Sequence, residues 1–203
     1  MAIHVRFDVH AAVVLMLCAM NLHAEALTAP SKITFNEDGV LVVDGKKLFP
    51  ITFTLAPPPD GKTPDGRHAY DELRGAGATF MRTGVGYWLG EAKEKKREPD
   101  KDFFADAIAR EKAWQDAAAA HGMRCDTWLG FDLSSPKTPE EESALKQVVN
   151  TFKDHPGMGL WKGEDEPQWG NKDPEILIKA AKIIHETDPN HPIWIVQAPR
   201  GRV

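Results

Sequence analysis

Carboxylates and indole rings are concentrated in the segment from Trp161 to Trp169, which also contains Glu164, Asp165 and Glu166. Two carboxyl groups that flank a glycosidic bond can act as general acid and as nucleophile or base. Indole rings offer flat apolar faces that can stack on the C–H faces of sugar rings. This combination of residue types therefore indicates carbohydrate chemistry.

Two further predicted strands end in residues of the same kinds. In a (β/α) barrel the active site is built at the carboxyl ends of the strands, so we expect these side chains to share one cleft with the 161–169 segment. For a second catalytic carboxylate opposite Glu166, Asp126 is the other candidate that we place in the cleft, because Glu164 lies beside Glu166 and offers no opposed face. The residues predicted to form the site are Arg82, Trp88, Trp128, Asp165, Glu166 and Trp169.

Other kinds of site lack their sequence patterns. The eight histidines form no H-E-x-x-H motif, and the cysteines show no paired C-x-x-C spacing. No metal site is therefore predicted. Gly84 and Gly86 lack a third glycine in the register of a phosphate-binding loop, and no cofactor is predicted. A net charge of −5 without a basic tract argues against nucleic acid as a partner.

Predicted strands alternate with predicted helices along most of the chain. Helices are expected near 67–74 and 101–121, after a capping box at Thr138–Glu141, and after Asp173 as N-cap. Before them, Asp44–Gly45 is a type I′ turn signal between short apolar segments. The strands are expected near 50–55, 78–82, 123–128, 159–164 and 193–197. We therefore predict an α/β fold: an incomplete TIM (β/α) barrel of about five βα units, preceded by a short N-terminal β-hairpin.

The first 26 residues have the pattern of an export signal. Arg6 supplies positive charge, 11–20 is an unbroken apolar run, and Ala24-Glu25-Ala26 fits the A-x-A cleavage pattern. The run is shorter than the roughly 20 residues that a membrane span needs. We predict a signal peptide over 1–26 and a secreted or periplasmic domain over 27–203, with no membrane association after cleavage. An uncleaved N-terminal anchor helix is the alternative.

The segment Leu160-Trp161-Lys162-Gly163-Glu164-Asp165-Glu166-Pro167 resembles the fourth-strand motif of the clan-A glycoside hydrolases, in which a Trp precedes Asn-Glu-Pro. Further segments resemble the same barrels in the same order. They are the lead-in hairpin at 44–50, the second strand at 77–82 with its terminal Arg, the step into the third strand at 121–123, and the approach to strand four at 152–161. The resemblance implies a glycoside hydrolase-like protein that acts on or binds carbohydrate, with Glu166 as general acid/base.

Two departures from the family pattern bear on function. Asp165 stands where the family has an Asn that donates a hydrogen bond to the sugar 2-hydroxyl, and an ionised Asp cannot donate. The resembled enzymes carry their nucleophile, a Glu, at the end of strand seven, which the five predicted strands do not reach. We therefore expect the chain by itself to cleave no glycosidic bond. The alternative function is that of a non-catalytic carbohydrate-binding barrel.

The last predicted strand also bears on partners. Ile193-Trp194-Ile195-Val196 is apolar on both faces, as expected of a strand in the interior of a parallel sheet. A five-stranded piece of a barrel would leave this strand at an edge. Free strand edges pair readily with other chains, so we expect self-association through this edge in addition to a carbohydrate ligand.

Overall fold

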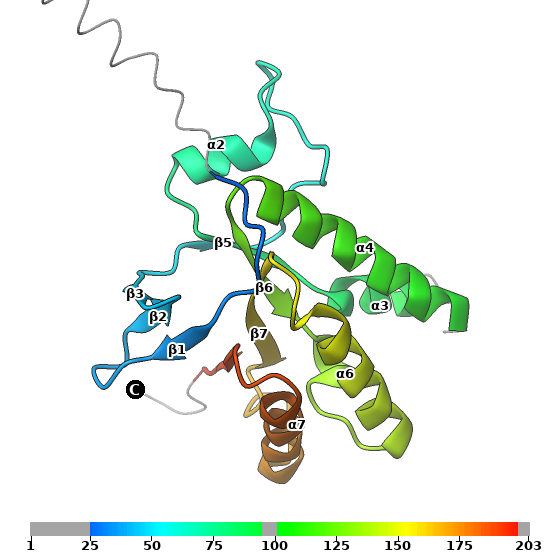
Figure 1. The fold of residues 1–203 in the computed structure, drawn as a ribbon. Coiled ribbons are helices and arrows are strands. Elements are labelled where there is room, and N and C mark those ends of the chain that lie inside the picture. Colours follow the sequence, from blue (N-terminus) through cyan, green and yellow to red (C-terminus); the bar gives the residue numbers. More distant parts are fainter. Residues whose placement is uncertain (1–24, 95–100, 199–203) are drawn as a thin grey trace, which may run out of the picture.

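The computed structural model describes residues 25–94 and 101–198. The predicted signal peptide, 1–26, therefore lies outside the described residues except for Glu25 and Ala26. In the described part of the chain, no helix has the length and apolar character needed to cross a membrane. Figure 1 shows a central sheet, a layer of helices beside it and a small N-terminal sheet.

A five-stranded parallel sheet forms the centre of the structure. The described sheet is open, with β4 and β8 at its edges, so a closed barrel is not shown. Its strands pair in chain order: β4 (Thr52–Phe53), β5 (Phe80–Thr83), β6 (Arg124–Trp128), β7 (Met158–Asp165) and β8 (Ile193–Val196). The predicted strands and their alternation with helices are thus confirmed.

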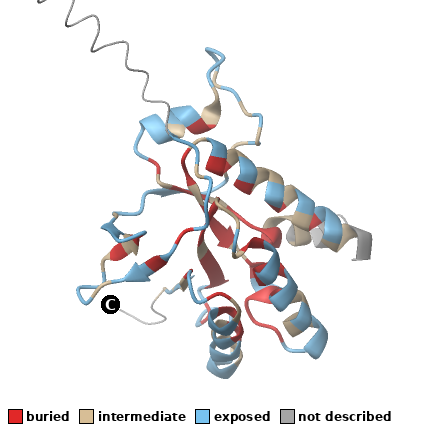
Figure 2. Cartoon of the chain, in the orientation of Figure 1, coloured by how far each residue is buried: buried red, intermediate tan, exposed pale blue. Residues whose placement is uncertain are grey.

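Burial along the strands follows their place in the sheet. The strands β5 to β7 are buried almost throughout, because helices cover one face and the N-terminal sheet packs against Phe80 and Leu160 on the other. The edge strand β8 is less buried, and Ile195 is 43% exposed. Figure 2 shows the same concentration of burial in the central strands and on the inward sides of the helices.

The helices pack against one face of the sheet. Their bounds are α2 (Ala69–Gly75), α3 (Val85–Glu94), α4 (Lys101–Ala120), α5 (Gly130–Leu133), α6 (Pro139–Phe152) and α7 (Pro174–Thr187). The predicted caps are confirmed: Thr138 and Glu141 form a reciprocal capping box on α6, and Asp173 accepts a hydrogen bond from the backbone N–H of Glu175 on α7. The helices α3 and α5 were not predicted. Both contain glycine, which lowers helix propensity, and they are stabilised by packing of Leu89 and Leu133 in the core.

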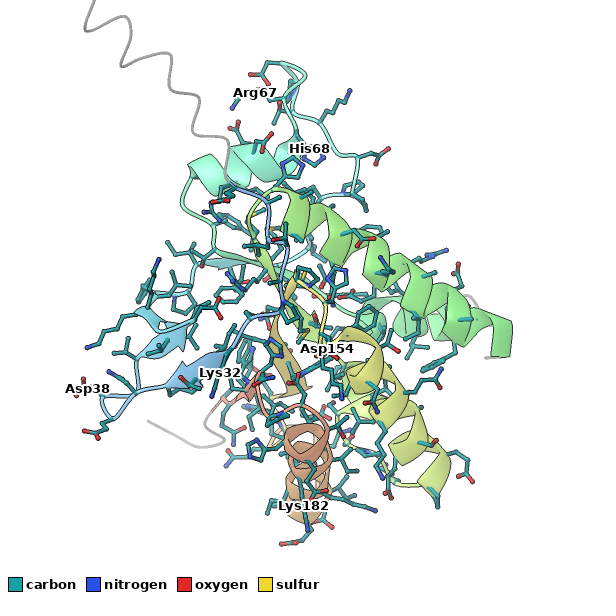
Figure 3. All side chains as sticks on the ribbon, viewed as in Figure 1. Lys32, Asp38, Arg67, His68, Asp154 and Lys182 are labelled. Atoms are coloured by element: carbon teal, nitrogen blue, oxygen red, sulfur yellow. The ribbon has the colours of Figure 1, made fainter. Side chains whose placement is uncertain are left out.

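The predicted N-terminal hairpin is present and extends to three antiparallel strands, β1 (Ile33–Phe35), β2 (Leu41–Val43) and β3 (Lys46–Lys47). Asp44 and Gly45 have φ angles of 50° and 81°, as a type I′ turn requires. The sheet buries its apolar side against Phe80 and Leu160 of the central sheet. At its outer end, charged side chains such as Asp38 extend into solvent (Figure 3).

A buried hydrogen-bond network joins the N-terminal segment to the central sheet. Ser31 Oγ lies 3.2 Å from His191 Nε2 and donates to the carbonyl of Met158, while His191 Nδ1 lies 2.8 Å from Asp188 Oδ2. The same Asp188 oxygen accepts from the indole N–H of Trp161 at 2.7 Å. Ser31, His191 and Asp188 have the order of a hydrolase triad, but each is at most 3% exposed. The network is therefore structural.

Asp188→Asn is expected to lower the free energy of unfolding by about 3 kcal/mol, because the new amide group would face donors in a buried network. Burial raises the pKa of Asp188, but the hydrogen bonds from His191 and Trp161 and the charge of His191 outweigh it and lower the pKa overall. The stabilisation is therefore present above the ordinary value of 3.8 and is lost as the pH falls through the lowered pKa.

Urea unfolding at pH 7 and at a series of acidic pH values would measure both effects. Asp154→Asn is the matched control, since Asp154 is exposed and its variant should unfold like the parent chain. Equal stability of the two variants at pH 7 would contradict the structural role of the network.

Candidate functional site

The carboxyl ends of the strands bring several of the predicted residues together on the face of the sheet that the helices leave open. Arg82 and Asp126 are register partners across β5 and β6, and Lys162 is a partner of both Trp128 and Trp194. Met81 and Cys125, the neighbours of Arg82 and Asp126, pack toward Ala118 of α4. Because side chains alternate along a strand, Arg82 and Asp126 point to the opposite face.

Asp126 accepts hydrogen bonds from two other strands of this face. One carboxylate oxygen accepts from Arg82 Nε at 3.2 Å, and the other accepts from Trp194 Nε1 at 2.8 Å. The guanidinium of Arg82 also lies 5.2 Å from the ring centroid of Trp194, within the range of a cation–π contact. Burial raises the pKa of Asp126, and the hydrogen bonds from Trp194 and Arg82 offset part of this increase.

A buried lysine forms the floor of the site, and the sequence analysis did not assign it. Lys162 is 2% exposed, and its ammonium group lies 5.8 Å and 5.6 Å from the ring centroids of Trp128 and Trp194. It donates to Asp165 Oδ1 and to the carbonyl of Gly163, both at 3.2 Å. Desolvation lowers the pKa of Lys162, although Asp165 opposes this shift. A charged residue inside an apolar strand was the signal that could have identified it.

Glu164 lies in a separate polar pair beside the site. It is 1% exposed, forms an ion pair of 3.2 Å with Lys172, and accepts from Ser134 Oγ at 3.3 Å. Lys172 also donates to Ser135 and lies 5.9 Å from the ring centroid of Phe131. The carboxylate of Glu164 is therefore enclosed and paired with a cation.

Glu166 has an unusual backbone conformation at the end of β7. Its φ angle is 46°, a left-handed conformation that is uncommon for non-glycine residues and that occurs often at functional sites. The conformation is held by a 2.9 Å hydrogen bond from its N–H to the carbonyl of Val196 and by another from the N–H of Trp169 to its carbonyl. The side chain is exposed, and Trp169 beside it is 54% exposed.

The remaining predicted residues are divided between the site and the helix layer. Trp128 lies over Lys162 and contacts Tyr87 and Phe131 edge to face, with centroid distances of 4.8 Å and 5.4 Å. Trp88 lies on α3, and its ring contacts Trp114 and Arg110 of α4. The structure thus groups Arg82, Trp128 and Asp165 around Lys162 and Asp126, with Glu166 and Trp169 in the following loop, whereas the observed ring contacts of Trp88 are with α4.

A pocket borders the site on the side of the N-terminal sheet. A pocket of about 250 Å³ lies between the N-terminal sheet and the open face of the central sheet, and Asp126 and Trp194 form part of its mainly apolar lining. Within residues 25–94 and 101–198, no group of three or more His, Cys, Asp or Glu side chains is arranged to hold a metal ion.

Close backbone contact joins β5 to β6 where the site begins. A Cβ atom on Gly84 would lie 2.1 Å from the carbonyl oxygen of Trp128, and one on Gly86 would lie 2.3 Å from the nitrogen of Gly130. Gly84 also has a φ angle of 137°. Only glycine allows this approach, so the two glycines fix the position of the strand ends that carry Arg82 and Trp128.

No family model matches the sequence, and no curated protein matches it. Among solved structures, a β-glucuronidase from Parabacteroides merdae is 13% identical with a TM-score of 0.48, and a glycoside hydrolase family 5 protein from Bacteroides vulgatus is 17% identical with a TM-score of 0.47. An exo-chitosanase from Amycolatopsis orientalis is 16% identical with a TM-score of 0.45. Each match covers 81% of this chain, but only 20%, 39% and 19% of the respective matched chains.

These matches concern the arrangement of strands and helices. The chain is similar over 81% of its length to solved glycoside hydrolases, as the sequence resemblance led us to expect. It spans well under half the length of each of them, and all three TM-scores are below 0.5. We therefore transfer no activity or substrate from these enzymes on the strength of the likeness.

Gly84→Ala is expected to lower the free energy of unfolding by more than about 3 kcal/mol, because the backbone of Trp128 would have to move. Gly66→Ala is the matched control: Gly66 has a φ angle of 87° but open space around it, so only the conformational penalty of about 1–2 kcal/mol applies. Urea unfolding of both variants would test this, and equal losses would show that the contact between β5 and β6 is not tight.

Proposed function

We propose that the protein is a glycoside hydrolase-like protein that takes carbohydrate into the site at the carboxyl ends of β5 to β8, with Glu166 as general acid/base. The observation that carries this proposal is the exposed carboxyl group of Glu166, held on a left-handed residue beside the exposed ring of Trp169. A proton donor and an apolar ring on the same loop are residue types that a glycosidic oxygen and its sugar ring require.

The charge pairing in the site supports this role for Glu166. Asp126 pairs with Arg82, Asp165 with Lys162 and Glu164 with Lys172. Among the described residues, no ion pair or side-chain hydrogen bond involves the carboxyl group of Glu166. It is therefore the carboxyl group of the site that is free to exchange a proton with a ligand.

We assign the neighbouring side chains to substrate binding. The exposed ring of Trp169 and the ring of Trp128 would stack on sugar rings, and Arg82 would donate to hydroxyl oxygens. Asp165 is 46% exposed and has one oxygen held by Lys162, so its other oxygen can accept from a sugar hydroxyl but cannot donate to one. A substrate-binding role for Trp88 stays a prediction.

One observation favours binding of carbohydrate without cleavage as a second candidate function. Both retaining and inverting hydrolysis need a second carboxyl group opposite the acid. The buried carboxylates of the site are Asp126 and Glu164. Each is 1% exposed and forms an ion pair with a cationic side chain. Neither is placed as a free nucleophile or base in the described part of the chain.

Carbohydrate binding is expected to be saturable in isothermal titration against a panel of oligosaccharides, and Trp169→Ala should weaken it by roughly tenfold through loss of stacking. Glu166→Gln should leave binding nearly unchanged. Where aryl glycosides with poor leaving groups are turned over, the same variant should lower the rate by about 10²–10⁴, and less for leaving groups that need no proton.

The outcomes separate the two functions. Saturable binding without turnover assigns the binding function alone, and equal rate losses for both kinds of leaving group show that Glu166 is not the acid. Glu186→Gln, which alters an exposed carboxylate on α7, controls for changes in overall charge. The absence of binding to every sugar would overturn the proposal.

We also propose that the protein is exported and that its mature chain starts near Leu27. Support comes from the apolar run and the Ala24-Glu25-Ala26 pattern. N-terminal sequencing of protein secreted by a bacterial host is expected to begin near Leu27. Retention of Met1 in the purified protein would contradict export by cleavage.

A further inference from the structure

A buried polar cluster lies behind the site, on the helix side of β5 and β6. Its centre is Glu111 of α4, which is fully buried. Glu111 Oε1 accepts from Thr83 Oγ1 at 2.7 Å and from Gln115 Nε2 at 2.9 Å, and Thr127 Oγ1 lies at 3.4 Å. Thr83 and Thr127 are the strand neighbours of Arg82 and Asp126, so the cluster contacts the same two strand ends from the opposite face.

Two buried oxygen atoms in this cluster lack a hydrogen-bond donor. Glu111 Oε2 and Gln115 Oε1 are buried without any hydrogen-bond partner, and both are acceptors if Glu111 is ionised. The other two atoms of the same groups, Gln115 Nε2 and Glu111 Oε1, already share a bond of 2.9 Å. A proton on Oε2 would turn it into a donor for Gln115 Oε1. One proton would thus satisfy two buried groups that otherwise cost free energy.

The surroundings of Glu111 supply no charge that would stabilise an ionised carboxylate. The titratable groups that face it are the buried thiol of Cys125 on β6 and the buried hydroxyl of Tyr70 on α2, and both are uncharged at neutral pH because burial raises their pKa values. The other charged groups belong to other surfaces. Arg82 and Asp126 of β5 and β6 pair on the open face, and Lys112 and Asp116 of α4 pair in solvent. Within the described residues, Glu111 has no ion pair.

We propose that Glu111 is a neutral carboxylic acid that pairs edge to edge with the amide of Gln115 and fastens β5 to β6 beneath the site. Loss of its proton removes one of the two bonds of this pair and leaves two buried acceptors facing each other. The strand ends that carry Arg82 and Asp126 then loosen. Glu111 is in this sense a positioning residue, and the inference does not depend on the ligand or reaction proposed above.

The direction of the pH dependence follows from the burial of this group. Burial raises the pKa of Glu111 from 4.5 to about 7, against the opposing hydrogen bonds from Gln115, Thr83, the backbone N–H of Gly84 and Thr127. The folded chain therefore holds a proton that the unfolded chain releases between these two values. The stability that the neutral acid provides is complete below pH 4.5 and is lost as the pH rises through about 7.

The test compares the full chain with Glu111→Gln, in which an amide can keep both bonds to Gln115 at every pH. Between pH 5 and pH 8.5 the folding equilibrium constant of the parent chain should fall roughly 10²-fold relative to that of the variant, measured by urea unfolding. Glu186→Gln, with its exposed carboxylate on α7, should keep the pH profile of the parent. Parallel profiles of the parent and Glu111→Gln would overturn the proposal.

Two further measurements remain decisive even if Glu111→Gln folds poorly. Infrared spectra of the parent chain near pH 5.5 should contain a protonated-carboxyl C=O band that disappears as the pH is raised through about 7, and absence of this band would contradict a neutral Glu111. Hydrogen exchange at the amides of Thr83, Gly84 and Thr127, corrected for the intrinsic effect of pH, should accelerate over the same range. Unchanged protection at these amides would show that the strand ends do not loosen.

Discussion

Asp126 lies on β6, the middle strand of the central sheet, and accepts hydrogen bonds from Arg82 on β5 and from Trp194 on β8. This carboxylate is 1% exposed, so removing either donor would leave a buried acceptor without a partner. The hydrogen bond to Asp126 holds the indole of Trp194 in the site. In this position the ring also lies near the ammonium group of Lys162. Three strands are connected across the open face by one side chain.

The two faces of β5 and β6 carry two different polar networks, and the strand geometry couples them. Alternation sends Arg82 and Asp126 to the open face and Thr83 and Thr127 toward Glu111. Gly84 adds a backbone contact with Trp128 that no other residue would permit. A change in either network therefore acts on the same short stretch of backbone, which makes the protonation of Glu111 relevant to the position of the site.

Pairing of charges distinguishes the buried carboxyl groups of the site from the exposed one at Glu166. The enclosed carboxylates, Asp126 and Glu164, each have a cation as partner, as buried charges require. Glu166 follows directly after β7, has a left-handed backbone conformation, and exposes its side chain to solvent. Within the described residues, Glu166 thus combines an exposed side chain with the absence of an ion pair.

Local signals in the sequence determined the elements of the fold: the five strands, the turn at Asp44–Gly45, the capping box at Thr138 and the cap at Asp173. These depend on near neighbours in the chain, so periodicity and cap residues suffice to predict them. The tertiary structure alone decided the burial of Lys162 between two indoles and the position of Trp88 against α4. It also decided that Glu111, one charged residue among many on a helix, lies fully buried with an unpaired oxygen. Such features arise from contacts between residues far apart in the chain, and no local pattern encodes which distant side chain will supply or withhold a partner.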